Sequence, residues 1–179
     1  MRVVRSIVAF TSAVTVAVAT FGIGSVVADA STAPSGTDAG YRIVAGDGGL
    51  FGFGRGNYLG GATGVKDAST VGAAVTSTGR GYWLATDAGG VLGFGDAGSF
   101  GSLIATRTTA PTVDIAALPA STGYWLATAD GGVFAFGAAP FLGSLGNVRF
   151  ASPIVAILAT PTGKGYWLVA SDGGGVQFR

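Results

Sequence analysis

The chain of 179 residues repeats one pattern four times. Each copy opens on a Gly-Tyr pair, and the tyrosines Tyr41, Tyr82, Tyr124 and Tyr166 are spaced by 41, 42 and 42 residues. A Gly-Gly pair follows in every copy, at 48/49, 89/90, 131/132 and 173/174. Apolar runs with aromatic residues come next at 50–54, 91–95 and 133–137, and a further motif of the Phe-x-Gly-Ser type lies at 58–61, 100–103 and 141–145. A fixed period of this length means that each copy is one supersecondary unit in an array.

Each unit is predicted to be a small antiparallel sheet. The segments 82–86, 124–128 and 166–170 are rich in aromatic and β-branched residues and are bounded by Gly and Asp, which is typical of strands. The Asp-Gly-Gly sequences at 47–49, 130–132 and 172–174 tolerate the positive φ of a tight hairpin turn. Apolar runs upstream of each tyrosine, at 71–76, 113–118 and 154–160, predict a second hairpin. With the Phe-x-Gly-Ser motif as an outer strand, each unit would have four strands.

A four-stranded unit of this size is typical of one β-propeller blade. The near-continuous apolar strands agree with blades that are covered on both faces by their neighbours. The first unit is expected to lack its innermost strand and the last its outer strand. The sequence therefore predicts an all-β, β-propeller-like array of about 14 strands, or about 3.5 blades.

The N-terminus has the pattern of an export signal. Residues 1–5 are basic, residues 6–27 carry no charge, and Ala28-Asp29-Ala30 offers a small-x-small cleavage site. We expect residues 1–30 to be a signal peptide, with a retained N-terminal membrane anchor as the alternative. Residues 31–39 read as a linker, and residues 40–179 as the repeat domain, with units starting near 40, 81, 123 and 165.

The repeat resembles a known family. The carriers of the resemblance are Gly-Tyr-Trp-Leu-Val-Ala-Ser-Asp-Gly-Gly at 165–174, Val-Phe-x-Phe-Gly at 133–137, the Phe-x-Gly-Ser motif and Pro-Ile-Val at 153–155. They are similar to the propeller-like tandem repeat of secreted bacterial, particularly actinobacterial, surface proteins, in which such arrays stand alone or beside cell-wall hydrolase and peptidase domains. This chain departs from the repeat at Arg42, where other copies have Trp, and at Asp87-Ala88, which inverts the Ala-Asp order. The last copy stops at 176–179.

The amino-acid composition excludes several kinds of catalytic, metal and nucleic-acid-binding sites. The chain has no His, Cys or Glu, so the usual imidazole bases, thiolate nucleophiles, disulfides and thiolate or imidazole metal sites are missing. Without residues 1–30 the remaining Lys, Arg and Asp side chains balance to a net charge of zero, which gives no electrostatic basis for nucleic-acid binding. We expect no catalytic residues, no cofactor and no metal site.

Three tryptophans, Trp83, Trp125 and Trp167, occupy the same position of the repeat. They could form an aromatic platform for sugar rings, but packing between blades is the favoured interpretation. Packing is also favoured for the tyrosines of the opposite strand face, Tyr82, Tyr124 and Tyr166.

The aspartates are interpreted first as structural. Asp47, Asp130 and Asp172 are assigned to hairpin turns, because one Asp per repeat supplies too few oxygens for Ca²⁺. Asp96 and Asp114 have no counterparts in the other copies and do not mark a glycosidase carboxylate pair.

The expected function is that of an exported, non-catalytic repeat module for binding or scaffolding at the cell surface or cell wall. The alternatives are a carbohydrate-active or hydrolytic propeller that uses Asp residues, and a purely structural or truncated array. Candidate partners are cell-wall glycan, another surface protein, or a second copy that completes a larger ring of about seven blades. The expected location is secreted or at the cell surface, and membrane-anchored if residues 6–27 are retained.

Overall fold

We describe the fold from a computed structural model of the whole chain. It describes residues 19–21, 24–28, 41–54, 56–65, 68–146, 148 and 152–179. These residues form strands, turns and loops and no helix, so no helix among them could cross a membrane.

Four antiparallel sheets follow one another along the chain. The first sheet has the strand order β1-β2-β3-β4, the second β5-β6-β7, the third β8-β9-β10 and the fourth β11-β12-β13. The strand bounds are β1 Ala19–Phe21, β2 Gly24–Ala28, β3 Tyr41–Ala45, β4 Leu50–Phe53, β5 Thr70–Val75, β6 Gly81–Thr86, β7 Val91–Gly95, β8 Thr112–Ala117, β9 Gly123–Thr128, β10 Val133–Gly137, β11 Ile154–Ala159, β12 Tyr166–Ala170 and β13 Gly175–Phe178.

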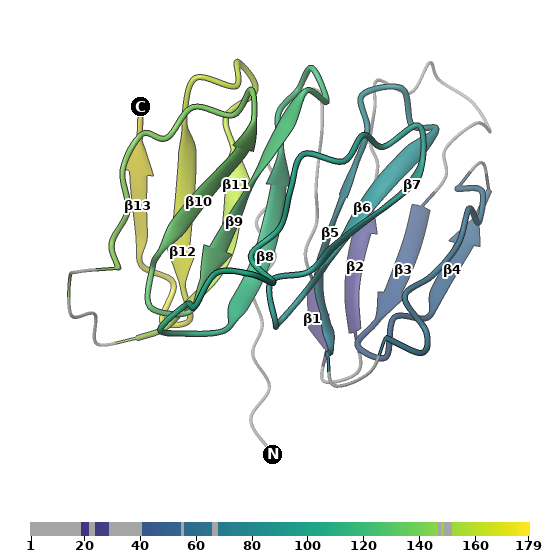
Figure 1. Cartoon of the computed structure of the whole chain (residues 1–179), viewed down its shortest axis with the longest axis horizontal. Coiled ribbons are helices and arrows are strands. Elements are labelled where there is room, and N and C mark those ends of the chain that lie inside the picture. The colour runs from purple at the N-terminus through teal and green to yellow at the C-terminus, as the bar shows by residue number, and fades with distance from the viewer. Residues whose placement is uncertain are drawn as a thin grey trace.

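The sheets stand in a row along the longest axis of the molecule (Figure 1). The fourth sheet lies at one end of the row and the first sheet at the other, so these two sheets do not meet to close a ring. Neighbouring sheets meet through their first strands, since β5 packs beside β8 and β8 beside β11. The described part of the chain is therefore an open row of small sheets.

The predicted hairpins are confirmed in the second, third and fourth sheets. In each, the strand that carries the Tyr pairs with the apolar strand before it and with the strand after the Gly-Gly pair. The first Gly of each pair has the positive φ that the turn requires, between 82° and 90° at Gly89, Gly131 and Gly173.

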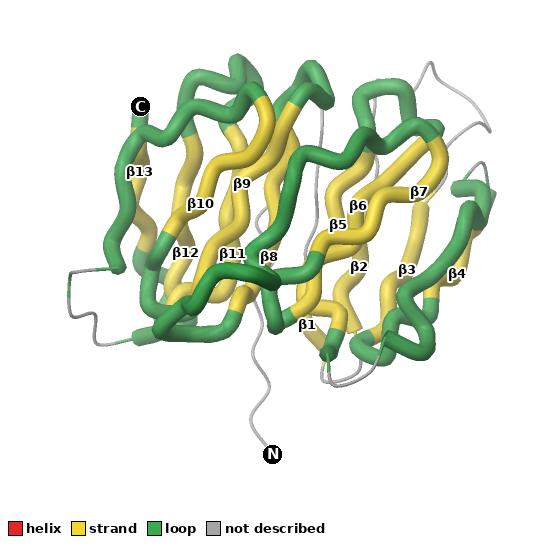
Figure 2. The backbone as a smooth tube through the Cα atoms, viewed as in Figure 1, coloured by secondary structure: helices red, strands yellow, loops and turns green. Residues whose placement is uncertain are grey.

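The predicted outer strand is wrong. The Phe-x-Gly-Ser segments at 58–61, 100–103 and 141–145 form no strand, and Figure 2 shows the chain after β7 and β10 as long loops. Each segment binds back to the hairpin turn of its own sheet, as in the Leu103 N–H bond of 2.8 Å to the Gly89 carbonyl. The Tyr hydroxyl of the next sheet donates to a carbonyl of the same segment. The backbone groups of the segment are therefore bonded to two different sheets and do not form a ladder along the edge of one sheet.

The innermost strand of the first sheet is present, contrary to the sequence-based expectation. Strand β2 pairs with β3 over five residues, as β5 pairs with β6. This strand lies within residues 1–30, which the sequence analysis assigned to an export signal, and β1 adds a further strand beside it. The uncharged Gly-Ser-Val-Val-Ala sequence has enough β-branched character to pair as a strand. The predicted linker, residues 31–39, lies outside the described residues.

The core lies between the sheets, in three clusters, one for each pair of neighbours. Between the second and third sheets, Trp83 and Ala85 of β6 pack against Tyr124 and Leu126 of β9. The same pairing joins Trp125 of β9 to Tyr166 and Leu168 of β12. Every sheet thus has two faces, which we call its Tyr face, directed at the preceding sheet, and its Trp face, directed at the following sheet.

Candidate functional site

The tryptophans proposed as a sugar platform lie mostly in the core. Trp83 and Trp125 are fully buried, and their Nε1–H groups donate to the carbonyls of Gly98 (2.7 Å) and Pro140 (2.8 Å). Their rings lie 5.7 Å and 5.3 Å from the tyrosine rings of the following sheet. Trp167 is partly exposed on the Trp face of the fourth sheet. A buried indole has no free π-face for a sugar, so only Trp167 could touch a ligand.

Arg42, the departure from the repeat, makes the same contacts as the tryptophans. Its Nε donates to the Asn57 carbonyl at 3.2 Å, 15 residues further along the chain, which is the separation found for both tryptophan bonds. Its guanidinium carbon lies 5.2 Å from the centre of the Tyr82 ring, in a cation–π contact. Arg42 therefore replaces an indole with another flat group that carries an N–H donor.

The tyrosines of the second, third and fourth sheets have structural partners as well. We call the segments 58–61, 100–103 and 141–145, which lie between one sheet and the next, the linking segments. The hydroxyls of Tyr82, Tyr124 and Tyr166 each donate to a glycine carbonyl of the preceding linking segment at 2.5 Å. Burial raises the pKa of all three hydroxyls against the opposing effect of these backbone contacts. The glycine is required there, because a Cβ at Gly101 would lie 2.9 Å from the ring of Phe136.

The turn aspartates fix the hairpins. Oδ1 of Asp47, Asp130 and Asp172 accepts the backbone N–H of the second Gly of each turn, at 2.9, 3.2 and 2.8 Å. In the second sheet, where Ala88 stands in the Asp position, Thr86 Oγ1 accepts the Gly90 N–H at 2.9 Å. Asp87 instead accepts the N–H of Ser69, which ties its turn to the segment leading into β5.

A hollow of about 240 Å³ lies beside one of these turns. Its polar lining comes from Thr109, Thr128, Asp130 and Ser144, and its aromatic lining from Phe134 and Phe141. Phe141 is 62% exposed, so its ring is open to solvent at the rim. Hydroxyl and carboxylate groups beside an exposed aromatic face suit a sugar, whose hydroxyls need hydrogen bonds and whose ring faces are apolar.

The carboxylate in this hollow is held in its ionised form. Oδ1 of Asp130 accepts from Thr128 Oγ1 at 2.5 Å, and Oδ2 accepts from Thr109 Oγ1. Partial burial opposes ionisation, but the bonds from Thr109 and Thr128 outweigh it and lower the pKa. A lowered pKa suits an acceptor of hydroxyl hydrogen bonds and is opposite to what a general acid needs.

The corresponding place in the fourth sheet carries a second hollow, of about 300 Å³, lined by Ser152, Asp172 and apolar residues that include Leu168 and Val176. The bond from the Gly174 N–H and a bond from Ser152 lower the pKa of Asp172. The two hollows stand at equivalent positions of neighbouring repeats, each with an ionised Asp and a hydroxyl side chain.

Asp114 has a different environment. Its side chain is 4% exposed, and its two carboxylate oxygens accept the N–H groups of Ile115 (2.8 Å) and Ile157 (3.0 Å), the latter on β11 of the next sheet. Burial raises its pKa to about 7 against these two bonds. Asp114 thus joins the third sheet to the fourth. Asp96, at the surface, accepts from Thr78 and Thr76, and these two bonds lower its pKa.

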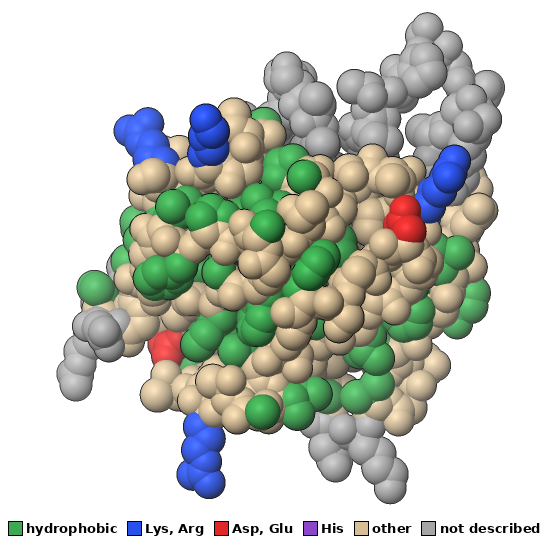
Figure 3. Space-filling view, turned by 45° about the horizontal axis from the view of Figure 1, so that its top comes forward, with side chains coloured by type: hydrophobic (Ala, Val, Ile, Leu, Met, Phe, Trp, Pro, Cys, Tyr) green, Lys and Arg blue, Asp and Glu red, His purple; other side chains and the backbone are tan. Residues whose placement is uncertain are grey.

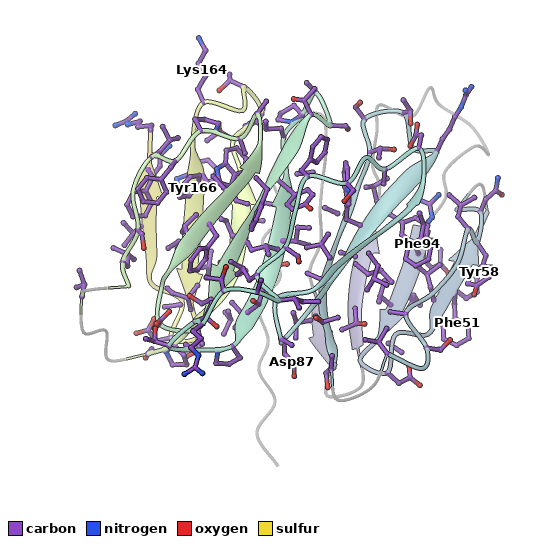
Figure 4. All side chains as sticks on the ribbon, viewed as in Figure 1. Phe51, Tyr58, Asp87, Phe94, Lys164 and Tyr166 are labelled. Atoms are coloured by element: carbon purple, nitrogen blue, oxygen red, sulfur yellow. The ribbon has the colours of Figure 1, made fainter. Side chains whose placement is uncertain are left out.

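A cluster of exposed aromatic side chains lies at the outer end of the first sheet. It consists of Tyr41, Phe51, Phe53 and Tyr58, and the rings of Tyr41 and Phe53 are stacked at 4.8 Å. Figure 4 shows Phe51 and Tyr58 at this end of the row, whereas Tyr166 lies among the strands of the other sheets. On the face drawn in Figure 3, hydrophobic side chains occupy the middle and the few charged side chains lie at the periphery.

Neither the hollow nor the aromatic cluster was identified from the sequence. The hollow combines Thr109 and Phe141 of two loops with a turn Asp, and although Phe141 belongs to the repeat motif at 141–145, the motif does not indicate that it lies beside Thr109 and the turn. Tyr41, Phe51, Phe53 and Tyr58 lie in the repeated motifs, so the repeat pattern does not single them out as a cluster. Comparison of the chain with protein-family models and with curated proteins gives no match.

Proposed function

We propose that this chain is a non-catalytic repeat module for binding and scaffolding that works outside the cytoplasm, at the cell surface or cell wall. We also propose that its row of sheets is a propeller-like array, in which each sheet corresponds to a blade. The observation that carries the binding role is the pair of equivalent hollows at the Asp130 and Asp172 turns. Cell-wall glycan is the ligand class favoured by the hydroxyl and carboxylate groups of both hollows and by the aromatic lining of the hollow at Asp130.

The state of the carboxylates favours binding over hydrolysis. A glycosidase needs one carboxyl group with a raised pKa as its acid, together with a second carboxylate facing it. The Asp130 and Asp172 side chains have lowered pKa values and are bound by neighbouring Thr, Ser or Gly groups. Asp114, whose pKa is raised, is buried between sheets and is out of reach of a polysaccharide.

Sedimentation with isolated bacterial cell wall tests this proposal. We expect the folded full chain to be retained saturably, and a heat-unfolded sample of the same chain not to be. Phe141→Ala should weaken retention, because it removes the exposed aromatic ring at the rim of the hollow beside Asp130. Ile104→Ala removes another exposed apolar side chain away from the hollow and serves as the matched control.

The alternatives give different results in the same experiment. A hydrolytic propeller would release soluble sugar from the wall, and this release would disappear in Asp130→Asn. A purely structural array would show no saturable retention of the folded chain. Retention that is unchanged in Phe141→Ala would place the wall-binding surface elsewhere on the molecule.

A further inference from the structure

The two end sheets of the row are each covered on one face only. In β3 burial alternates, with Arg42 and Val44 buried and Tyr41 and Ile43 more exposed. In β12 burial alternates in the opposite phase, with Tyr166 and Leu168 buried and Trp167 more exposed. By contrast, all six residues of β6 and of β9 are buried.

The opposite phases mean that the two open faces are different. The first sheet covers its Trp face, through Arg42, and leaves its Tyr face open. The fourth sheet covers its Tyr face and leaves its Trp face open. One end of the row therefore presents a Tyr face, and the opposite end presents a Trp face. These two faces are the two halves of the contact between neighbouring sheets.

The contact between such faces is made three times within the chain. Trp83 meets Tyr124, Trp125 meets Tyr166, and Arg42 takes the place of the Trp against Tyr82. A valine of the first strand joins two of these contacts, since Val71 and Val113 pack into the clusters between the second and third and between the third and fourth sheets. The corresponding valine of the fourth sheet, Val155, is 45% exposed.

The open Tyr face already has the arrangement of the covered ones. In the second, third and fourth sheets the Tyr ring lies 5.3 to 5.6 Å from the ring of the Phe directly opposite it on the adjacent strand, as in Tyr82–Phe94, Tyr124–Phe136 and Tyr166–Phe178. Tyr41 and Phe53 form the same pair at 4.8 Å, although they are 46% and 43% exposed. An exposed and preorganised apolar surface of this kind marks an interaction site.

We propose that the chain associates head to tail with a second copy of itself. The Tyr face of the first sheet of one copy, with Tyr41 and Phe53, packs on the Trp face of the fourth sheet of the other, with Trp167 and Val155. The occupant is a second copy because the two open faces are the two halves of the contact that the chain makes three times internally. Within one chain the first and fourth sheets stand at opposite ends of the row, so their open faces do not meet (Figure 1).

This contact is heterologous, because different surfaces of the two copies meet. It repeats until the rotation between sheets closes a ring, and two copies would bring eight sheets together. The inference rests on the proposed scaffolding function and gives that function a partner. It does not depend on wall binding, since the hollows lie beside the hairpin turns, apart from the residues named for the contact.

The mass of the full chain in solution tests the proposal. We expect sedimentation equilibrium to show concentration-dependent association across the micromolar range. Tyr41→Asp and Val155→Asp should each weaken association about tenfold or more, because each places a charge in an apolar contact. Ile104→Asp changes a side chain that is 74% exposed and belongs to neither open face, so it should associate as the unchanged chain does.

A mixing experiment distinguishes head-to-tail association from a symmetric dimer. The Tyr41→Asp chain keeps its Trp face, and the Val155→Asp chain keeps its Tyr face. Mixed together, the two variants should form a one-to-one complex through one intact contact and no larger species. Circular dichroism spectra and unfolding curves control for folding of each variant. Because Tyr41 and Val155 are both exposed, we expect these curves to match those of the unchanged chain.

Three results would overturn the proposal. They are a full chain that is monomeric at every concentration, an oligomer that neither Asp variant weakens, and a mixture in which the two variants do not combine. None of these bears on retention by cell wall, so the association and the wall-binding function can fail separately.

Discussion

Strands β6 and β9 share the sequence Gly-Tyr-Trp-Leu-Ala-Thr, and all six residues are buried in both. Strand β12 carries the similar sequence Tyr-Trp-Leu-Val-Ala, yet it buries only alternate residues. The difference lies in the neighbours, since β6 and β9 belong to sheets with a sheet on either side and β12 belongs to the last sheet of the row.

The comparison separates what a repeat encodes from what its position decides. The repeat encodes a sheet with two apolar faces, and each face is buried only where the array supplies another sheet. The same side chain therefore has a large energetic role inside the row and a small one at its end. Substitutions made in pairs, one interior and one terminal, measure this difference directly.

The largest difference is expected at the tryptophans. Trp125→Ala should lower the free energy of unfolding by about 3–5 kcal/mol, because it empties a fully buried site and leaves the Pro140 carbonyl without its donor. Trp167→Ala should cost about 1 kcal/mol, since its ring is already partly exposed and has no following sheet. Urea unfolding at a concentration below that of self-association gives both values. Equal losses would show that the fourth sheet is covered on both faces.

The repeat made the hairpins predictable and the linking segments unpredictable. Tyr, Trp and Leu between glycines predict a strand because the local pattern alone is sufficient, and the turn glycines fix where it ends. The segment 100–103 has the same aromatic and glycine content as a strand, but Gly101 lies against Phe136 and its carbonyl accepts from Tyr124. Contacts with the next sheet determine this conformation, and the sequence of the segment alone does not predict it.

The first sheet shows a second limit of the sequence. Its inner strand comes from Gly24–Ala28, which a pattern of basic, apolar and small residues assigns to export. An uncharged, β-branched stretch satisfies both interpretations, so the pairing with β3 could not be chosen from composition. The hollow at Asp130 needed tertiary structure for another reason, because Thr109 and Phe141 lie in loops 32 residues apart.

Asp114 offers a test of the interior environment by pH. Its counterparts in the neighbouring repeats are Gly72 and Ala156, so this carboxyl group is specific to the third sheet. Burial raises its pKa from 3.8 to about 7 in the folded chain. The folded state therefore binds the proton more tightly, and the stabilisation is present below about pH 4 and is lost as the pH rises to about 7.

We expect the free energy of unfolding to fall over this range by a few kcal/mol through Asp114, about 1.4 kcal/mol for each unit of pKa difference. Asp114→Asn should remove this slope while keeping the size of the side chain. The measurement is the difference between the two chains in urea unfolding at pH 4.5, 6 and 8. A difference that stays constant across these values would contradict the raised pKa. Asp96, Asp130 and Asp172 have lowered pKa values, and their contributions cancel in the difference.

Arg42 tests how closely a terminal sheet follows the repeat. Arg42→Ala should lower the free energy of unfolding by about 2 kcal/mol, because it removes the bonds to Asn57 and Gly79 and the contact with the Tyr82 ring. Arg42→Trp should restore most of this loss, since Nε1 of an indole can reach the same carbonyl 15 residues on. If Arg42→Trp were as unstable as Arg42→Ala, the charge itself, and not the flat donor group, would be what the site requires.

The smallest difference is expected at the tyrosine hydroxyls. Tyr124→Phe leaves the Gly101 carbonyl without its donor inside the row and should cost about 1 kcal/mol. Tyr41→Phe should change the free energy of unfolding by about 0.2 kcal/mol or less, because the Tyr41 side chain is exposed on the open face. Thermal and urea unfolding of the two variants at low concentration would show this difference. The same measurement can be made at concentrations where copies associate. If Tyr41→Phe lowers the free energy of unfolding only there, a segment of the second copy supplies the acceptor for the Tyr41 hydroxyl, as Gly101 does for Tyr124. A Tyr41→Phe variant that is already destabilised at low concentration would instead show that its hydroxyl has a partner within its own chain.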